Sequence, residues 1–235
     1  MGKLVFLSGA GLSAPSGLST FRDNNGLWEQ YDLDVVCNYE TWLKNYDLVH
    51  EFYNKRRLEL KKVKPNKMHE KIAELSNRFE VINFTQNVDD LLERAGCKNV
   101  IHLHGKLLEL HCVNCGDEIR LNLEDDLEFE FGNCKKCQSK MMKPSVVFFG
   151  EHAPFYAELY STFYNLKEDD LAIIIGTSGA VININSLLRF AKSKNILINL
   201  EKNKYIDECL FSNVIYKSCD ECIDELEQII QEWNS

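Results

Sequence analysis

The chain has 235 residues, with 27 Lys and Arg against 36 Asp and Glu, so its formal net charge is 27 − 36 = −9. This acidity argues against a nucleic-acid partner, because proteins hold the phosphate backbone mainly through clustered Lys and Arg. Apolar residues make up 45% and charged residues 27% of the chain, as in folded globular proteins. The length predicts one large domain, alone or with a smaller lobe.

The opening segment MGKLVFLSGAGLSAPSG turns to Gly and Ser after about four apolar residues, too few for the core of a signal peptide. No run reaches the roughly 18 apolar residues that a membrane span requires. We therefore expect a cytoplasmic protein without a membrane partner and, as its oligomeric state, a monomer. Nine cysteines in a reducing compartment favour metal ligands or free thiols over a disulfide framework.

Short β-branched apolar runs predict six buried strands. They begin at Leu4, Val81, Val100, Leu171, Asn195 and Val214. Amphipathic segments of helical length lie between several of them, and others follow. These segments are Met68 to Arg78, Val88 to Ala95, Ile182 to Ser193 and the tail from Cys222 to Trp233. The alternation of strand and helix predicts an α/β fold, in which a parallel sheet carries helices on both faces.

Two regions interrupt this alternation. Residues 27–66 are rich in aromatic side chains and show no clear strand, so we predict helices packed outside the sheet. Residues 106–143 contain four cysteines and few large apolar residues. We interpret both regions as insertions that form a small lobe. The remaining segments, residues 1–26, 67–105 and 144–235, then make up the large domain.

The clearest chemical signal is a pair of Cys-x-x-Cys motifs separated by 18 residues. The motifs contain Cys112, Cys115, Cys134 and Cys137. Each motif can supply two corners of a tetrahedron, which is the geometry that zinc requires. Because sulfur would fill all four positions, no open position remains for water, and we predict one structural zinc ion. Two pairs of idle or redox-active thiols are the alternative.

A glycine-rich turn, GAGLSAPSG from Gly9 to Gly17, follows the first predicted strand. Glycines at a strand-to-helix turn let the backbone approach a pyrophosphate, and the N–H groups there stabilise its charge. An ordinary dinucleotide fold would place an acidic residue at the end of a second strand about 20 positions later. Residues 29–34 show no such strand, which weakens the case for a hydride-transfer enzyme; a plain glycine-rich turn is the other reading.

Two histidines, His102 and His104, lie in the segment VIHLHG. Strand alternation predicts that both imidazoles lie on one face, opposite Ile101 and Leu103. Each histidine fits either a base near neutral pH or a buried structural residue. Polar residues also follow three other apolar runs, in QNVD from Gln86, GTS from Gly176 and NLE from Asn199. Polar groups that meet at the carboxyl edge of a parallel sheet predict a ligand crevice there.

The ordered motifs GAGLSAPSGLSTFR, TQNVD, HLHG, the paired CxxC, KPSVVFFGE, GTS and NLE resemble those of the sirtuins, which are NAD-dependent protein-lysine deacylases. The resemblance covers essentially the whole chain. It implies a Rossmann-like large domain and a small lobe built from a zinc module and a helical module. It also implies NAD as cofactor and acylated-lysine proteins as substrates.

The resemblance assigns roles to individual positions. His104 is implied as the catalytic base, with His102 as a structural neighbour. The residues implied in NAD binding are Gly9, Ala10, Gly11, Ser13, Gly17, Phe21, Arg22, Trp28, Gln86, Asn87, Val88, Asp89, Gly176, Thr177, Ser178, Asn199, Leu200, Glu201 and Cys219. The edge implied to receive the substrate peptide as an added strand consists of Val147, Phe149, Gly150 and Glu151. The implied products are free lysine, nicotinamide and O-acyl-ADP-ribose.

Tyr53 and Arg56 are three positions apart, so on a helix they share one face. This Y-x-x-R pattern resembles the sirtuin subgroup that removes succinyl and malonyl groups, in which Arg binds the distal carboxylate and Tyr adds a hydroxyl donor. Thr20 before Phe21-Arg22 is similar to the same subgroup. We therefore expect removal of both succinyl or malonyl and acetyl groups. An amphipathic helix with a packed Tyr and a solvated Arg is the simpler alternative.

Three other functions remain open. An NAD hydrolase or ADP-ribosyltransferase would release nicotinamide without an acyl-lysine peptide. A non-catalytic module would bind NAD or acylated tails and would tolerate the loss of His104. A redox protein would use its CxxC thiols and would hold no zinc.

Overall fold

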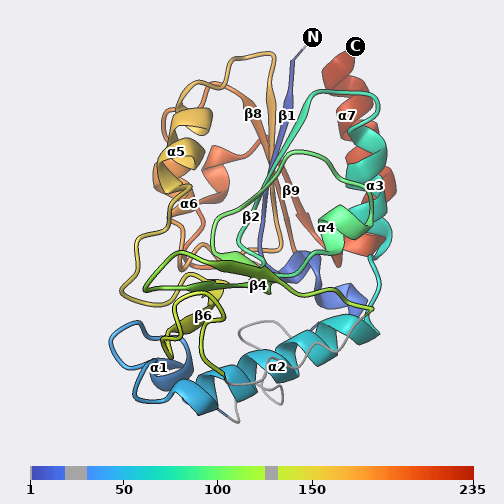
Figure 1. Cartoon of the computed structure of the whole chain (residues 1–235). Coiled ribbons are helices and arrows are strands. Elements are labelled where there is room, and N and C mark those ends of the chain that lie inside the picture. The colour runs from blue at the N-terminus through green and yellow to red at the C-terminus, as the bar shows by residue number, and fades with distance from the viewer. Residues whose placement is uncertain (1, 19–30, 125–131) are drawn as a thin grey trace.

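The computed structural model describes residues 2–18, 31–124 and 132–235. Six parallel strands form the main sheet, in the order β3-β2-β1-β7-β8-β9 (Figure 1). Their bounds are β1 Leu4–Ser8, β2 Val81–Thr85, β3 Val100–His102, β7 Leu171–Ile175, β8 Lys194–Asn199 and β9 Asn213–Tyr216. All six predicted strands are therefore confirmed, and so is the α/β class.

Helices cover both faces of this sheet because its central strands β1 and β7 are buried along their whole length. Leu4 and Phe6 of β1 pack on one face with α3 (Lys67–Leu75), α4 (Leu91–Arg94) and α7 (Ile223–Asn234). Val5 and Leu7 point to the other face, toward α5 (Tyr156–Tyr164) and α6 (Ile184–Leu188). Figure 1 shows these two helical layers on opposite sides of the sheet.

The order of the strands fixes where a ligand can bind. From β1 the chain continues to β2 and β3 on one side, whereas β7, β8 and β9 lie on the other side. The loops that leave β1 and β7 therefore diverge at the carboxyl ends of two adjacent strands. A crevice at such a change of direction is the usual ligand site of open α/β sheets.

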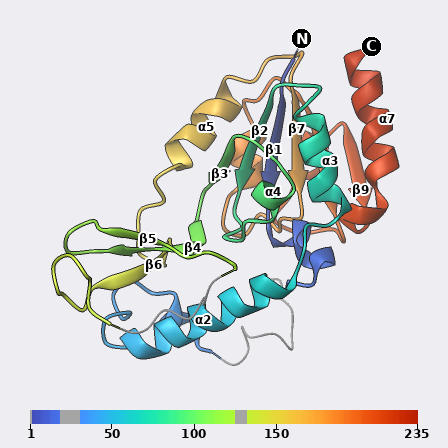
Figure 2. The ribbon, with the colours of Figure 1, turned by 45° about the vertical axis from the view of Figure 1, so that its right-hand side comes forward.

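A second group of elements lies beyond this edge (Figure 2). It contains the helices α1 (Leu33–Val36) and α2 (Tyr46–Lys62) and an antiparallel sheet in the order β5-β4-β6. The strands of that sheet are β4 Gly105–Cys112, β5 Glu118–Arg120 and β6 Met142–Val146. Trp42 and Phe52 share a core with Leu107 of β4 and Phe148, which joins the helical part to the antiparallel sheet.

The far end of the antiparallel sheet has a much smaller core. Its fully buried members are Leu110, Cys112, Cys134 and Met142, so two of the four residues are cysteines. Burial of so little apolar surface stabilises a segment weakly. This part of the chain therefore needs a further source of stability. The zinc ion predicted from the cysteine pattern would supply it.

Three of the four predicted helices are shorter than the hydrophobic pattern indicated, whereas the tail helix α7 has the expected length. The segment from Ile182 to Ser193 contains only α6, which Asn183 caps by accepting a hydrogen bond from Ser186 N, and β8 already starts at Lys194. The helix expected from Val88 begins at Leu91, since Val88 O accepts a hydrogen bond from Leu107 N. No helix in the described ranges is both long and apolar enough to cross a membrane.

Candidate functional site

Three glycines bring the backbone after β1 against the backbone after β7. Gly9 N donates to Ile175 O and Gly11 N donates to Gly176 O, each at 2.9 Å. A Cβ atom on Gly9 would lie 2.7 Å from Gly176 O, and one on Gly11 would lie 2.7 Å from Gly176 Cα. Only glycine fits at these positions, because a side chain would collide with the facing backbone.

The loop continues as two short 3-10 helices, Ala10–Leu12 and Ala14–Ser16, and turns at Gly17. Gly17 has a φ of 95°, which favours glycine. Phe21, Arg22 and Trp28, which the resemblance assigned to NAD binding, lie outside the described residues.

Asn87 and Asp89 fix this loop to the end of β2. The Asn87 amide donates to Gly9 O at 3.1 Å and to Ser13 Oγ at 3.0 Å. Ser13 Oγ in turn donates to Asp89 Oδ2 at 3.0 Å. Burial raises the pKa of Asp89, and the hydrogen bonds from Leu91 N and Ser13 oppose that shift. The structure thus brings residues that lie 74 to 78 positions apart into one polar cluster.

A second polar cluster joins the ends of β2, β7 and β8. Gln86 Nε2 donates to Thr177 Oγ1 at 2.9 Å. The Asn199 side chain forms two hydrogen bonds with the Thr177 backbone, accepting from N at 3.1 Å and donating to O at 2.9 Å. The polar residues predicted to meet at the carboxyl edge are therefore joined in one hydrogen-bonded network, and the ligand crevice there stays a prediction.

Four further positions surround this edge. Ser178 is partly buried beside Thr177, whereas Leu200 is 76% exposed and Glu201 is exposed. Cys219 is buried, and its Sγ lies 3.7 Å from Gly11 O and 3.6 Å from Leu12 O. The structure therefore brings Cys219 from the carboxyl-terminal region to the glycine loop, although 208 positions separate it from Gly11.

The prediction that His102 and His104 share one face of a strand was wrong. Strand β3 ends at His102, because its pairing with β2 stops where β2 ends at Thr85. His104 lies in the turn before β4, which starts at Gly105 with a φ of 81°.

The two imidazoles also differ in their partners. His102 is buried, with Nδ1 2.9 Å from Asn87 O and Nε2 2.7 Å from a carboxylate oxygen of Glu93. His104 Nδ1 lies 3.1 Å from Gln86 O, and its Nε2 lies 2.8 Å from the Tyr156 hydroxyl. Burial lowers the pKa of His104, and the Gln86 carbonyl partly opposes this shift. A neutral imidazole at the edge of the crevice is suited to act as a base.

The chain between Val147 and Glu151 runs next to His104. Val147 N donates to His104 O at 2.9 Å. The main chain of Phe149 is already hydrogen-bonded on one side. Its N donates to Cys37 O at 2.7 Å, and its O accepts from Tyr39 N at 3.0 Å. Glu151 points inward and accepts from Phe148 N at 2.6 Å. The Glu151 side chain therefore helps to fix the main chain of this segment.

Tyr53 and Arg56 both lie on α2, as predicted. The Tyr53 ring is 3% exposed and stacks on Phe148, with 5.7 Å between ring centroids. Its hydroxyl lies 3.5 Å from Cys37 Sγ, a contact that the sequence did not indicate. Burial lowers the pKa of Arg56, and the charges of Glu59, Tyr53 and Asp89 oppose this shift. Arg56 is thus electrostatically coupled to the Asp89 cluster.

The four predicted metal ligands meet in one cluster. The Sγ atoms of Cys112, Cys115, Cys134 and Cys137 all lie within 4.8 Å of one another. The Sγ–Sγ distances are 3.6 Å for Cys112 and Cys137 and 3.7 Å for Cys115 and Cys134. A tetrahedral ion with Zn–S bonds of about 2.3 Å separates its sulfurs by about 3.8 Å, so the cluster fits zinc.

Hydrogen bonds further support the cluster as a thiolate site. Ser139 Oγ lies 3.1 Å from Cys137 Sγ, and the Asn114 amide donates to the same sulfur at 3.5 Å. A metal-bound thiolate needs donors of this kind around it.

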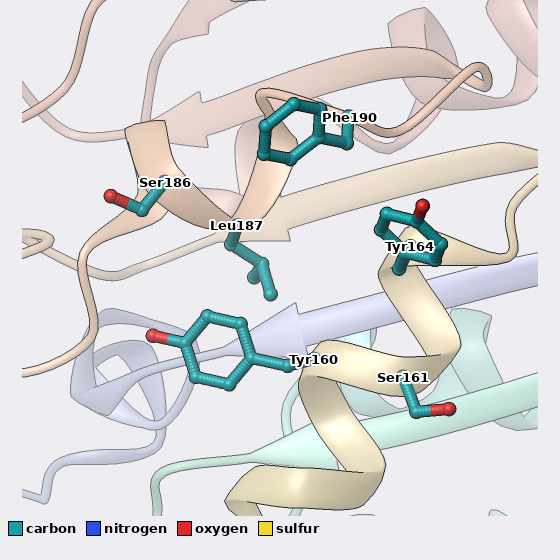
Figure 3. Close-up of a pocket in the computed structure, with 6 residues that line it drawn as sticks. All are labelled: Tyr160, Ser161, Tyr164, Ser186, Leu187 and Phe190. Atoms are coloured by element: carbon teal, nitrogen blue, oxygen red, sulfur yellow. The ribbon is translucent and has the colours of Figure 1, made fainter.

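A separate apolar depression lies on the surface of the helical layer that covers one face of the main sheet. It lies between α5 and the segment from α6 to Phe190 (Figure 3). Its volume is about 370 Å³, and Tyr160, Tyr164, Leu187 and Phe190 are among its lining residues. None of its lining residues is a predicted site residue. The depression is therefore distinct from the polar carboxyl edge.

A model of the Sir2 family matches residues 9–183 of the chain. The chain belongs to the Sir2 family. This Sir2 protein is 46% identical to an NAD-dependent protein deacylase of Helicobacter hepaticus, with 99% of each sequence covered. It is 44% identical to an NAD-dependent protein deacylase of Campylobacter jejuni strain RM1221, with 100% of each sequence covered.

Solved structures of Sir2 proteins agree with this assignment. A Sir2 homologue in complex with NAD has a TM-score of 0.85 and 31% identity, and the alignment covers 99% of this chain and 91% of that one. A Sir2 homologue mutant in complex with ADP-ribose gives the same TM-score and identity, with 98% and 92% covered. The family predicted from the ordered motifs is therefore confirmed.

Proposed function

We propose that this Sir2 protein removes acyl groups from lysine side chains of proteins in an NAD-dependent reaction. The observation that carries the proposal is the position of His104, a partly buried imidazole whose pKa burial lowers, at the same sheet edge as the glycine loop and the Asn87–Asp89 cluster. A base, a phosphate cradle and an amide–carboxylate pair are what such a reaction needs within one crevice. The names of the curated relatives agree with this function.

The placement of individual residues supports the roles that we propose for them. Bound NAD would supply a ribose carbon that loses nicotinamide and receives the acyl oxygen of the substrate. Gly9, Gly11 and Gly176 form the cradle for the pyrophosphate, and Asn87 and Asp89 orient the nicotinamide ribose from the end of β2. His104 accepts a proton at Nε2, since Nδ1 already faces the Gln86 carbonyl. The remaining NAD contacts, including Phe21, Arg22 and Trp28, stay predictions from the family resemblance.

We propose that the acyl chain enters between α2 and the Val147–Glu151 segment. Tyr53 and Arg56 lie on this side of α2, and Tyr53 packs on Phe148 of that segment. The Arg56 guanidinium, whose pKa burial lowers and the charge of Asp89 raises, would bind the carboxylate of a succinyl or malonyl group. An acetyl group lacks that carboxylate, so its binding would depend on apolar contacts with side chains such as Tyr53 and Phe148.

We also propose that the chain divides into two lobes along the predicted boundaries, with one structural zinc ion in residues 106–143. The shared core of α2 and β4 supports a single small lobe, and the four-cysteine cluster supports the metal. The expectations of a cytoplasmic monomer without nucleic-acid or membrane partners stay predictions.

Product mass spectrometry on one peptide in succinyl, acetyl and unmodified forms tests the function. With NAD and the full chain we expect free lysine peptide and O-acyl-ADP-ribose from both acylated forms, and no reaction with the unmodified form. Release of nicotinamide with the unmodified peptide would instead favour an NAD hydrolase. No nicotinamide release from any form, despite bound NAD, would favour a non-catalytic binding module.

A further inference from the structure

The partners of the His104 ring fix the position of its proton. Its Nδ1 atom lies 3.1 Å from the main-chain oxygen of Gln86, which can only accept a hydrogen bond. The proton of the neutral ring is therefore on Nδ1, and Nε2 carries the lone pair. The Tyr156 hydroxyl, 2.8 Å from Nε2, must then donate to it. The nitrogen that acts as the base is thus already occupied by a donor from this chain.

Tyr156 is held in place by the element that carries it. It is the first residue of α5, and Leu159 and Phe163 of this helix are fully buried against the main sheet. The Tyr156 ring packs partly buried on the same core. Its centroid lies 5.9 Å from that of His104. The hydrogen bond therefore joins the base to a buried helix.

The groups that face His104 come from two elements besides its own turn. They are the Gln86 carbonyl at the end of β2 and the Tyr156 hydroxyl at the start of α5. Burial raises the pKa of Tyr156, as does the charge of Tyr160 one turn along, so Tyr156 remains a donor at neutral pH. Among the described residues, no ion pair involves His104, whereas His102 faces the Glu93 carboxylate.

The single lone pair on Nε2 of His104 can accept a strong hydrogen bond from only one donor at a time. A ribose hydroxyl that gives its proton to Nε2 must occupy the position now held by the phenol. We propose that Tyr156 is a positioning residue, which holds the His104 ring through Nε2 in the free protein and gives way to a ribose hydroxyl of the bound dinucleotide. This inference rests on the proposed function and adds a residue to it that lies 52 positions from the base.

Two consequences follow from this exchange. First, a donor to Nε2 stabilises the neutral ring, so removal of the phenol raises the pKa of His104. Second, a nucleotide no longer has to displace the phenol, so binding becomes tighter. The gain equals one hydrogen bond, roughly twofold to tenfold in affinity.

The test compares Tyr156→Phe with Tyr164→Phe, which removes a hydroxyl from the 67% exposed end of the same helix. Nitrogen-15 NMR of the histidine rings in the nucleotide-free protein, with His104→Asn to assign the signal, reports the tautomer and the pKa. We expect the Nδ1–H tautomer in the wild type and in Tyr164→Phe. In Tyr156→Phe we expect the same tautomer, held by the Gln86 carbonyl, and a raised pKa; an unchanged pKa of His104 in that variant overturns the proposal.

Calorimetry with ADP-ribose tests the exchange without any turnover. We expect tighter binding to Tyr156→Phe, by roughly twofold to tenfold, and wild-type affinity in Tyr164→Phe. Equal or weaker binding to Tyr156→Phe shows that the phenol does not compete with the ribose, and it overturns the exchange. Neither measurement depends on deacylation, so failure of the proposed function and failure of this inference are distinguishable.

Discussion

The Lys143 ammonium group lies 2.8 Å from a carboxylate oxygen of Glu151, and both side chains are turned into the protein. Lys143 is 1% exposed and also donates to Val146 O at 2.7 Å. The same Glu151 oxygen accepts from Phe148 N at 2.6 Å. One buried ion pair therefore fixes the chain that runs from β6 past His104 toward α2.

Lys143→Met should destabilise the protein by about 3 to 5 kcal/mol, because it leaves the Glu151 carboxylate without its cation. We also expect a higher KM for the acylated peptide, since the Val147–Glu151 segment loses its anchor. Urea unfolding and peptide kinetics measure the two effects. The matched control is Lys140→Met, whose 3.2 Å ion pair with Asp47 is exposed and should change stability by less than about 1 kcal/mol. Equal losses in both variants would contradict the anchoring role.

Cys112→Ser should lower the bound zinc from one ion per chain to well below one. The reason is that a hydroxyl replaces one of four thiolates in a tetrahedral site whose binding free energy also stabilises the fold. Elemental analysis after gel filtration gives the stoichiometry. Cys209→Ser removes an exposed cysteine outside the cluster and should keep a full complement of metal. A zinc-free wild type with normal stability would contradict the structural site.

Stability should fall as the pH is lowered from about 6.5 to about 4, because His69 is buried. Its pKa is lowered by burial to about 4, whereas the unfolded chain titrates near 6.5, so in this window the unfolded state binds more protons. The loss is up to about 1.4 kcal/mol per pH unit, and stability is flat above the window. His50, whose pKa burial also lowers to about 4, adds to this slope.

His69→Gln isolates this contribution. The Nδ1 atom of His69 accepts from Asn66 N in a capping box at the start of α3, and Gln preserves that hydrogen bond. Urea unfolding at several pH values should give a shallower slope for His69→Gln. His152→Gln changes an exposed histidine and should keep the wild-type slope. Identical slopes in all three proteins would show that His69 does not control acid stability.

Arg56→Met should reduce desuccinylation far more than deacetylation. A buried hydrogen bond to a charged group contributes about 1.5 to 3 kcal/mol, so the ratio of the two kcat/KM values should change by roughly tenfold to a hundredfold. Lys62→Met, which removes an exposed cation from the end of the same helix, should leave the ratio unchanged. Parallel losses on both substrates would remove Arg56 from the acyl pocket.

His104→Asn should lower turnover by roughly a hundredfold to ten-thousandfold while the melting temperature stays close to that of the wild type. In the wild type, the acid limb of kcat/KM should lie below pH 6.5, because burial lowers the pKa of His104 from that ordinary value and the ring stays neutral in weak acid. The pH profile of peptide deacylation measures this limb. An acid limb above pH 6.5 would mean that another group titrates.

The sequence was informative wherever a local pattern decides the structure. Continuous apolar runs predicted all six strands of the main sheet, and the spacing of Cys112, Cys115, Cys134 and Cys137 predicted their cluster. In both cases the requirement is local: a strand buried on both faces must be apolar throughout, and two nearby thiols must reach one ion.

Other features depend on contacts between distant segments. The face of His104 was predicted wrongly because β3 ends where its neighbour β2 ends. The alternation of apolar and polar residues within VIHLHG does not indicate where that neighbouring strand stops. The contacts of Tyr156 with His104 and of Cys37 with Tyr53 arise from tertiary packing across 52 and 16 positions. No spacing rule or motif points to either pair.

Strand β4 belongs to two cores at once. Leu107 packs with α2 and Phe148 beside the proposed acyl pocket, whereas Leu110 and Cys112 pack around the thiol cluster. Loss of the metal would thus disturb the wall of the proposed pocket through one continuous strand of eight residues.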